Sequence, residues 1–226
     1  MKKKADGLSV FLVDIKDAMG RGMTVRPIRN MVNHETNEVF FDGLEVPAEN
    51  MIGEENKGWR VGSMGLNLDR VGAARYLISV RRDEDIVNYV KSTRDMGDYC
   101  PANDEAMRDK IAELWTEAQV CRLMTMRSMS IVERGGKFTY EGSAEKVWAP
   151  EHGVRVTEAI TQMLGPYATL LRTSKHALMD GVFGHNVMGS FQSGINHGSV
   201  QVMRDQVARR GLELPSSRRS KTGEAK

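Results

Sequence analysis

The sequence predicts a mainly α-helical protein in which an incomplete β segment precedes a bundle of four long helices. Short runs rich in β-branched and aromatic residues lie before residue 50. From Trp59 onward, apolar residues recur at three- and four-residue spacing, the pattern of amphipathic helices. Glycines and capping residues divide this helical part into separate helices. At 226 residues and 40% hydrophobic composition, the chain can bury the core of one or two domains.

Three segments near the start are typical of strands. Leu8–Ile15 is a short, apolar, β-branched run. Met23–Ile28 alternates, and it should end or lie at an edge near Pro27, which cannot donate to a sheet. Asn37–Val46 carries apolar residues around an Asp-Gly pair. So few strands do not make an independent sheet, and the sheet is therefore predicted to be incomplete.

The first two long helices follow from periodicity and punctuation. The first starts at Trp59 and continues to about Gly97, with a stripe that includes Val61, Met64 and Leu68. The second is expected over Asp104–Arg134, with Asp104 or Asn103 as its N-cap and a Gly-Gly pair as its stop.

Two further helices complete the predicted bundle. One is expected over Gly142–Met163, although Pro150 should kink or interrupt it. The last is expected over Ser199–Arg210 and ends at a glycine. The glycine-rich stretch between them is expected to hold a short helix near Arg172–Met179. The predicted domains are a partial β domain over 1–53, a helical domain over 54–215 and a disordered tail over 216–226.

Composition argues against several classes of function. Lys+Arg 32 against Asp+Glu 30 gives a net charge of +2 and no reason to expect nucleic-acid binding. No apolar run approaches the roughly 18 residues of a membrane helix. Two cysteines fit a reducing compartment, so a cytoplasmic protein is expected. No metal site is expected, because the histidines outside the loop discussed next lack ligand-spaced partners: His34, His152, His176 and His185.

The stretch Gly194–Asp205 (GINHGSVQVMRD), continued by QVARRGLELP, carries the strongest functional signal. It resembles the C-terminal active-site loop and last helix of the acyl-CoA dehydrogenase family. Three other blocks resemble the same family in the same order: Asn37–Trp59, Leu66–Ala74 and Gln162–Gly165. The resemblance covers the second half of the family's β domain and its C-terminal four-helix domain.

The resemblance implies an oxidoreductase of fatty acid or lipid metabolism. Such a flavoprotein binds FAD, oxidises an acyl-CoA thioester to an enoyl-CoA and passes electrons to an electron-transfer flavoprotein. It also implies a homo- or hetero-oligomer. Because the resemblance covers only half of the family pattern, it implies a truncated gene product, a fragment or one polypeptide of a split enzyme. The alternative is a non-catalytic helical interaction subunit or a remnant.

Two residues are candidates for the base. His197 stands where the family usually has the Glu that removes the substrate α-proton, and a neutral imidazole can act as a base near pH 7. Asp69 lies where some members place the catalytic carboxylate on the first long helix, although Asp is one methylene shorter than Glu. Arg70 matches an Arg that contacts the CoA moiety. The alternatives are a structural His before a helix at His197 and exposed, solvated charges on a helix at Asp69 and Arg70.

The resemblance also implies flavin contacts at four positions: Gln162, Gly165, Ser199 and Gln201. Without the resemblance, these residues would be interpreted as helix-end and capping residues. Two features depart from the family pattern. Pro166 replaces the second glycine of the usual pair, and Thr93 stands where the family has an Arg that contacts pyrophosphate. Arg94, one position later, is the candidate substitute for that Arg.

Overall fold

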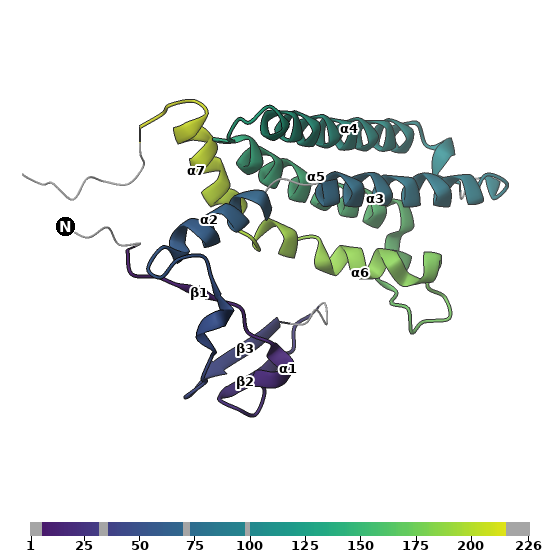
Figure 1. Ribbon diagram of the computed structural model, residues 1–226. Helices are drawn as coiled ribbons and strands as arrows, with labels where there is room; N and C mark the ends of the chain where they lie inside the picture. The colour runs from purple at the N-terminus through teal and green to yellow at the C-terminus, as the bar shows by residue number, and fades with distance from the viewer. Residues whose placement is uncertain (1–5, 32–35, 70–72, 98–99, 216–226) are drawn as a thin grey trace, which may run out of the picture. The chain divides into compact units, whose positions relative to one another are not determined.

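The computed structural model describes residues 6–31, 36–69, 73–97 and 100–215, without the side chains of residues 66–69 and 73. The chain forms two compact units, Met1–Leu68 and Asp69–Lys226, which are described separately. The mainly α prediction is confirmed, because long helices dominate the second unit (Figure 1).

The first unit contains two small antiparallel sheets. Strand β1 (Val10–Phe11) pairs with β4 (Met51–Ile52), and β2 (Met23–Ile28) forms a hairpin with β3 (Thr36–Phe41). The short elements α1 (Ile15–Ala18) and η1 (Ala48–Asn50) follow β1 and β3, and helix α2 (Gly58–Asp69) belongs to this unit as far as Leu68.

The predicted strand over Met23–Ile28 is confirmed, whereas the other two are shorter than predicted. Asn37–Val46 is extended only as far as Phe41. The prediction for Leu8–Ile15 is largely wrong, because only two of its residues form a strand and Ile15 begins α1. The physical reason is the Asp14 side chain, which accepts the N–H of Lys16 at 2.8 Å and so caps a helical turn.

Much of the apolar surface of the first unit is exposed. Of its described apolar residues, only Ala18 and Met23 are buried. Leu12 and Phe41 are 67% and 65% exposed, and Val39 lies on the same side of β3 as Phe41. We call Met23, Val25, Val39 and Phe41 the hairpin face, because their register places them on one side of β2 and β3.

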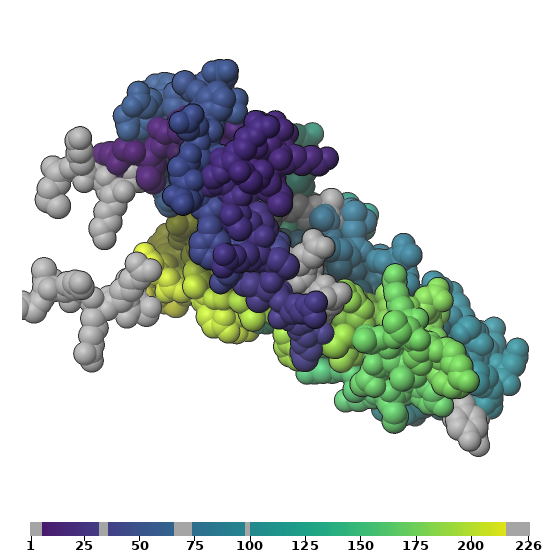
Figure 2. All heavy atoms as spheres, turned by 90° about the horizontal axis from the view of Figure 1, so that it is seen from below, coloured from purple at the N-terminus to yellow at the C-terminus, as the bar shows by residue number. Residues whose placement is uncertain are grey.

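In the second unit, three long helices lie side by side (Figure 1): α3 (Ala73–Ser92), α4 (Glu105–Glu133) and α5 (Glu141–Leu164). Helix α7 (Val200–Arg210) packs against α5, and so does α6 (Val182–Gly189). Turns of 3₁₀ helix connect these elements: η3 (Pro101–Asn103), η4 (Gly165–Thr169), η5 (Leu178–Gly181) and η6 (Gln192–Gly194). In Figure 2 the green segment from η4 to α6 forms much of the visible surface of this unit.

Local capping explains where several of these helices begin and end. Asp104 accepts the N–H of Met107 at 3.2 Å and starts α4, as predicted. Gly135, with φ 76°, follows the end of that helix. The single long helix predicted over residues 59–97 corresponds to α2 and α3, and residues 70–72 between them lie outside the described residues.

Two helix predictions differ from the structure. Pro150 was predicted to kink or interrupt the third helix, and the interruption does not occur, because α5 continues through this residue. A proline removes only one backbone donor, and the neighbouring buried residues Ala149 and His152 keep this part of the helix packed. The short helix predicted over Arg172–Met179 is also wrong. Met179 and the two residues after it have positive φ, and α6 begins only at Val182.

The hydrophobic core lies between α3, α4, α5 and α6. It includes Ile86, Leu114, Ile160 and Phe183, each at most 1% exposed. The Phe183 ring meets Tyr89 edge to face, with centroids 6.0 Å apart. This core fixes α5 between its neighbours, and α5 in turn supports the loop before α7.

A row of buried polar side chains, here called the polar seam, also runs between α3, α4 and α5. Glu145 accepts hydrogen bonds from Thr125, at 2.9 Å, and from Ser128. Nε2 of His152 lies 3.1 Å from the Leu114 carbonyl oxygen and 3.5 Å from Oδ2 of Asp83. All five seam side chains (Asp83, Thr125, Ser128, Glu145, His152) are at most 2% exposed.

The two cysteines are free and buried. Burial, followed by the nearby Glu145 carboxylate, raises the pKa of Cys121 to about 11. None of the helices in the described part of the chain has the length and apolarity needed to cross a bilayer.

Candidate functional site

The candidate site is the loop between η6 and α7. Its first half is held by backbone hydrogen bonds: Gly194 N–H to Phe191, Ile195 N–H to Gln192 at 3.0 Å, and Asn196 N–H to the same Gln192 carbonyl at 3.1 Å. We call residues 192–199 the active-site loop. Its backbone is ordered by these contacts before the chain reaches His197.

The second half of the loop turns sharply at His197 and Gly198, whose φ angles are 52° and 95°. The left-handed region is uncommon for residues with a Cβ, although His is among those that adopt it more often. A Cβ at Gly198 would lie 2.8 Å from Cε of Met203, which is 1% exposed. Glycine is therefore favoured there by its backbone conformation, an added Cβ would have to displace the end of the Met203 side chain, and the turn leaves His197 exposed.

Ser199 begins α7 by accepting the N–H of Val202 at 3.4 Å, so its hydroxyl hydrogen can still be donated to another group. Gln201, in the first turn, is exposed. The free N–H groups and positive dipole of the first turn of α7 favour an anion or a polar ring edge. His197, Ser199 and Gln201 are thus brought together by the local chain.

Three contacts attach the loop and α7 to α5. Lys146 of α5 donates to the carbonyl oxygen of Ser193 in the loop. Ser143 Oγ donates to Gln206 Oε1 at 3.1 Å. Arg204 and Glu151 form an ion pair at 2.5 Å.

The predicted flavin contacts on α5 lie at the other end of that helix. Gln162 is 16 positions beyond Lys146, which corresponds to about 24 Å at the helical rise of about 1.5 Å per residue. Gly165 ends α5 with φ 54°, and nothing lies within 4 Å of the place where a Cβ would stand. Both residues are exposed. Within one chain, therefore, the structure separates Gln162 and Gly165 from Ser199 and Gln201.

The residues after α3 differ in their surroundings. Thr93 is 4% exposed, and its hydroxyl donates to the carbonyl oxygen of Val90 at 2.9 Å. It therefore has a structural role and no access to a ligand. Arg94 is exposed.

The remaining two candidates are described only in part. Asp69 is the last residue of α2, and its side chain lies outside the described residues. Arg70 lies outside them entirely. Neither residue is placed relative to the active-site loop.

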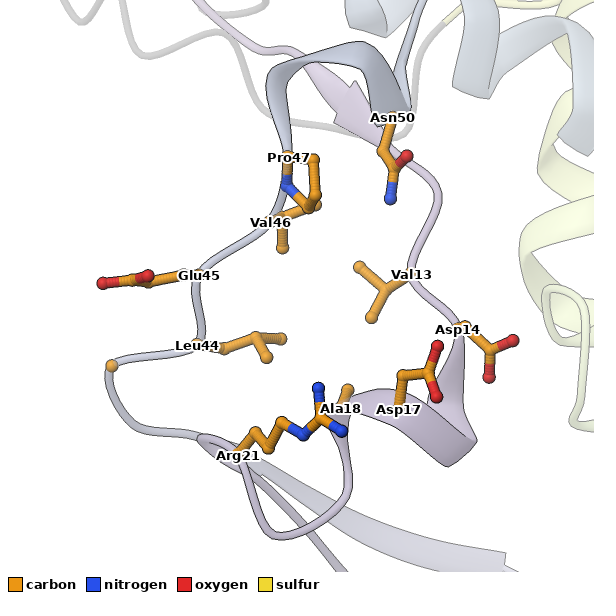
Figure 3. A pocket seen from close by; sticks show the side chains of 11 residues that line it. Val13, Asp14, Asp17, Ala18, Arg21, Leu44, Glu45, Val46, Pro47 and Asn50 are labelled. Atoms are coloured by element: carbon orange, nitrogen blue, oxygen red, sulfur yellow. The ribbon is translucent and has the colours of Figure 1, made fainter.

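The first unit has a hollow of about 460 Å³ between the segments 13–21 and 43–50 (Figure 3). Figure 3 shows Val13, Leu44 and Val46 pointing into it, with Asp17 and Arg21 at one end. The side chain of Glu45 points away.

Sequence reasoning missed Lys146. The residue is 0% exposed on the face of α5 that also carries Ala149, Val156 and Ile160. A lysine at helical spacing from three buried apolar residues was the available signal, because a charged residue in an apolar stripe needs a specific partner.

Comparison with known proteins adds the family context. Residues 56–212 match the family model described as acyl-CoA dehydrogenase, C-terminal domain. The chain is 26% identical over 220 residues to acyl-CoA dehydrogenase FadE26 of Mycobacterium tuberculosis, covering 96% of this chain and 54% of that protein. It is also 26% identical to the caffeyl-CoA reductase-Etf complex subunit CarC of Acetobacterium woodii, over 74% of this chain and 44% of CarC.

The fold is similar to a solved structure as well. The ChsE4-ChsE5 complex from Mycobacterium tuberculosis contains a chain that matches with a TM-score of 0.76 at 25% identity, over 94% of this chain and 53% of that one. The present chain thus spans about half the length of the curated relatives that it matches.

Proposed function

The chain belongs to the acyl-CoA dehydrogenase family through its C-terminal domain, and on that premise we propose that it works as part of an FAD-dependent acyl-CoA dehydrogenase. The reaction removes a proton from the α-carbon and a hydride from the β-carbon of an acyl-CoA thioester, leaving an enoyl-CoA. When bound, the flavin supplies the hydride acceptor, and its electrons pass on to an electron-transfer flavoprotein.

The observation that carries the proposal is the active-site loop. Its ordered first half, the turn at His197 and Gly198 and the capped start of α7 place an exposed imidazole next to free backbone donors. In this proposal, His197 removes the α-proton. Asp69 is the other candidate base, and Arg70 contacts the CoA phosphates through its guanidinium.

The residues present fit a flavin as two partial sets. Ser199 and Gln201 offer polar donors at the start of α7, while Gln162 and the open space over Gly165 lie at the far end of α5. Arg94 offers a cation for the pyrophosphate. Because the sets lie about 24 Å apart along α5, we propose that two chains of an oligomer contribute to each flavin site.

The names of two similar proteins and the exposed apolar surface support a proposal about partners. CarC is named as a subunit of a complex with Etf, and ChsE4-ChsE5 is a complex of two differently named proteins. The exposed apolar residues of the first unit also favour a partner that covers them. We propose a homo- or hetero-oligomer in which another chain covers this surface. A cytoplasmic location remains a prediction.

The test is reconstitution. The full chain is co-expressed with a complementing homologue and purified, and flavin absorbance is measured, followed by the rate of flavin reduction by acyl-CoA thioesters of different length. His197→Ala and Asp69→Ala are compared with the parent. Loss of a general base lowers the rate by about 10²–10⁴-fold. If both variants reduce the flavin at the parental rate, neither residue is the base.

A second candidate function is a non-catalytic helical subunit of the same family. It is favoured by the residues that depart from the family pattern: His197 in place of Glu, the buried Thr93 and Pro166 after Gly165. On this interpretation the complex binds flavin and turns over through its other member. His197→Ala and Asp69→Ala then leave the activity of the complex unchanged.

A further inference from the structure

We propose that Lys146 is a positioning residue, which sets the place of His197 by holding the carbonyl oxygen of Ser193. The proposal rests on the function proposed above, because it concerns the geometry of the active-site loop. Lys146 lies on α5 and Ser193 in the loop, 47 positions apart in the sequence. Lys146 touches neither substrate nor flavin in this role.

The burial of Lys146 makes this contact costly to lose. The side chain is 0% exposed, and an ammonium group out of water must be compensated by hydrogen bonds or opposite charge. A hydrogen bond from a charged donor contributes more than a neutral one, by roughly a factor of two. The bond to Ser193 therefore ties the loop to a helix that is itself fixed by the hydrophobic core.

Ser193 lies directly before the part of the loop that leads to His197. Its own hydroxyl donates to the carbonyl oxygen of Ser190 at 2.8 Å, and the next three residues carry the amides that order the loop. His197 follows four positions later. At the other end, Ser199 and the buried Met203 fix the start of α7.

The loop is therefore held at two points, and α5 contributes to both. Ser143, one turn before Lys146, bonds to Gln206 of α7, and Glu151, further along α5, pairs with Arg204. Both ends of the loop are attached to the same helix, α5. The position of His197 therefore depends on the Lys146–Ser193 hydrogen bond as well as on the packing of α7. Without Lys146, only the α7 end remains attached to α5 through these contacts.

The test measures amide hydrogen exchange of the full chain, resolved to Gly194, Ile195 and Asn196, in the parent and in Lys146→Met. Methionine keeps most of the volume of the side chain and removes the ammonium donor. The three loop amides should be protected in the parent and should exchange about 10- to 100-fold faster in the variant, the effect of losing one charge-assisted hydrogen bond. Amides in the middle of α4 and α5 should keep their parental rates.

Arg155→Met is the matched control, because it removes a cation from the same helix. Arg155 pairs with Glu117 of α4 at 2.8 Å and lies over the Trp148 ring, and none of the described hydrogen bonds joins it to the loop. Its loop amides should exchange as in the parent. Unprotected loop amides in the parent, or equal loop rates in the parent and Lys146→Met, would overturn the proposal.

A measurement on the parent alone keeps the proposal testable if Lys146→Met does not fold. The ammonium protons of Lys146 should give a slowly exchanging ¹⁵N-correlated signal with a nuclear Overhauser contact to the Gly194 amide. A rapidly exchanging Lys146 signal without this contact contradicts the proposal. None of these measurements needs flavin, so failed reconstitution would count against the proposed function and leave this result intact.

If the reconstituted complex does reduce flavin, the role of Lys146 predicts a split effect. Lys146→Met should lower the rate of flavin reduction at saturating substrate by about tenfold or more, since misplacement of a catalytic group by about 1 Å is costly. The substrate concentration for half-maximal rate should stay unchanged. An unchanged reduction rate would show that Lys146 does not position the base.

Discussion

The surroundings of Cys121 in the helical unit change the pKa and the reactivity of its thiol. Its thiol is 0% exposed beside the Glu145 carboxylate, and its pKa rises from 9.0 to about 11, first through burial and then through that charge. The folded protein thus favours the protonated, neutral thiol over the thiolate. A thiol held in this way packs as a small apolar group and is a poor nucleophile.

A pH effect on stability follows from this shift. Above pH 9 the unfolded thiol loses its proton while the folded one keeps it until about pH 11, so the Cys121 contribution to stability is lost as the pH rises between these values. The free energy of unfolding in urea should therefore fall more steeply over this range in the parent than in Cys121→Ala. Parallel curves for the two proteins would show that the shift is absent.

Helix α6 packs closely against the segment that precedes it. A Cβ placed on Gly184 would lie 2.6 Å from the carbonyl oxygen of Leu170. The helix therefore packs against the backbone before it through a glycine. Many glycines of this sequence mark loops and helix ends, whereas Gly184 allows close contact within a helix.

We expect Gly184→Ala to destabilise the helical unit by about 1–3 kcal/mol, because a backbone atom has little freedom to move away from an added methyl group. Gly65→Ala in α2 is the control. It is also helical, but nothing lies within 4 Å of its Cβ position, and this change should be neutral or stabilise by up to about 1 kcal/mol. Thermal and denaturant unfolding measure both, and equal effects would refute the packing argument.

Elements with local signals were predictable from sequence, and those set by distant contacts were not. Asp104 and Ser199 cap α4 and α7 through their own side chains, so those helices start where expected. The start of α6 depends on positive φ at Met179 and Asp180, and neither residue type predicts that conformation from the sequence. In the site, the loop was recognisable from its motif. The contact from Lys146 was not, because its partner is 47 positions away.

At the scale of the whole molecule, exposed apolar surface predicts association. The hairpin face carries Val39 and Phe41, which are 45% and 65% exposed, and the open backbone edges of β2 and β3 lie beside it. Such surfaces are usually covered by another chain or segment. We therefore expect the purified chain to self-associate at micromolar concentration.

Val39→Thr combined with Phe41→Thr should weaken this association by about tenfold or more while the hairpin is retained, because threonine keeps a high β-propensity and removes apolar area. Glu38→Thr, on the opposite side of β3, is the control and should leave association unchanged. Sedimentation velocity over a concentration series measures all three proteins. A parent that stays monomeric throughout, or a control that dissociates as readily as the double variant, contradicts the prediction.

The polar seam restricts how this sequence can diverge. A single replacement of Glu145 by an apolar residue leaves the Thr125 hydroxyl without its carboxylate acceptor, whereas Ser128 can still donate to the Met124 carbonyl oxygen. That first step is unfavourable, even where apolar residues at both positions are well tolerated. Among homologues, Glu145 and Thr125 should accordingly change together, so that their covariation records that α4 and α5 are neighbours.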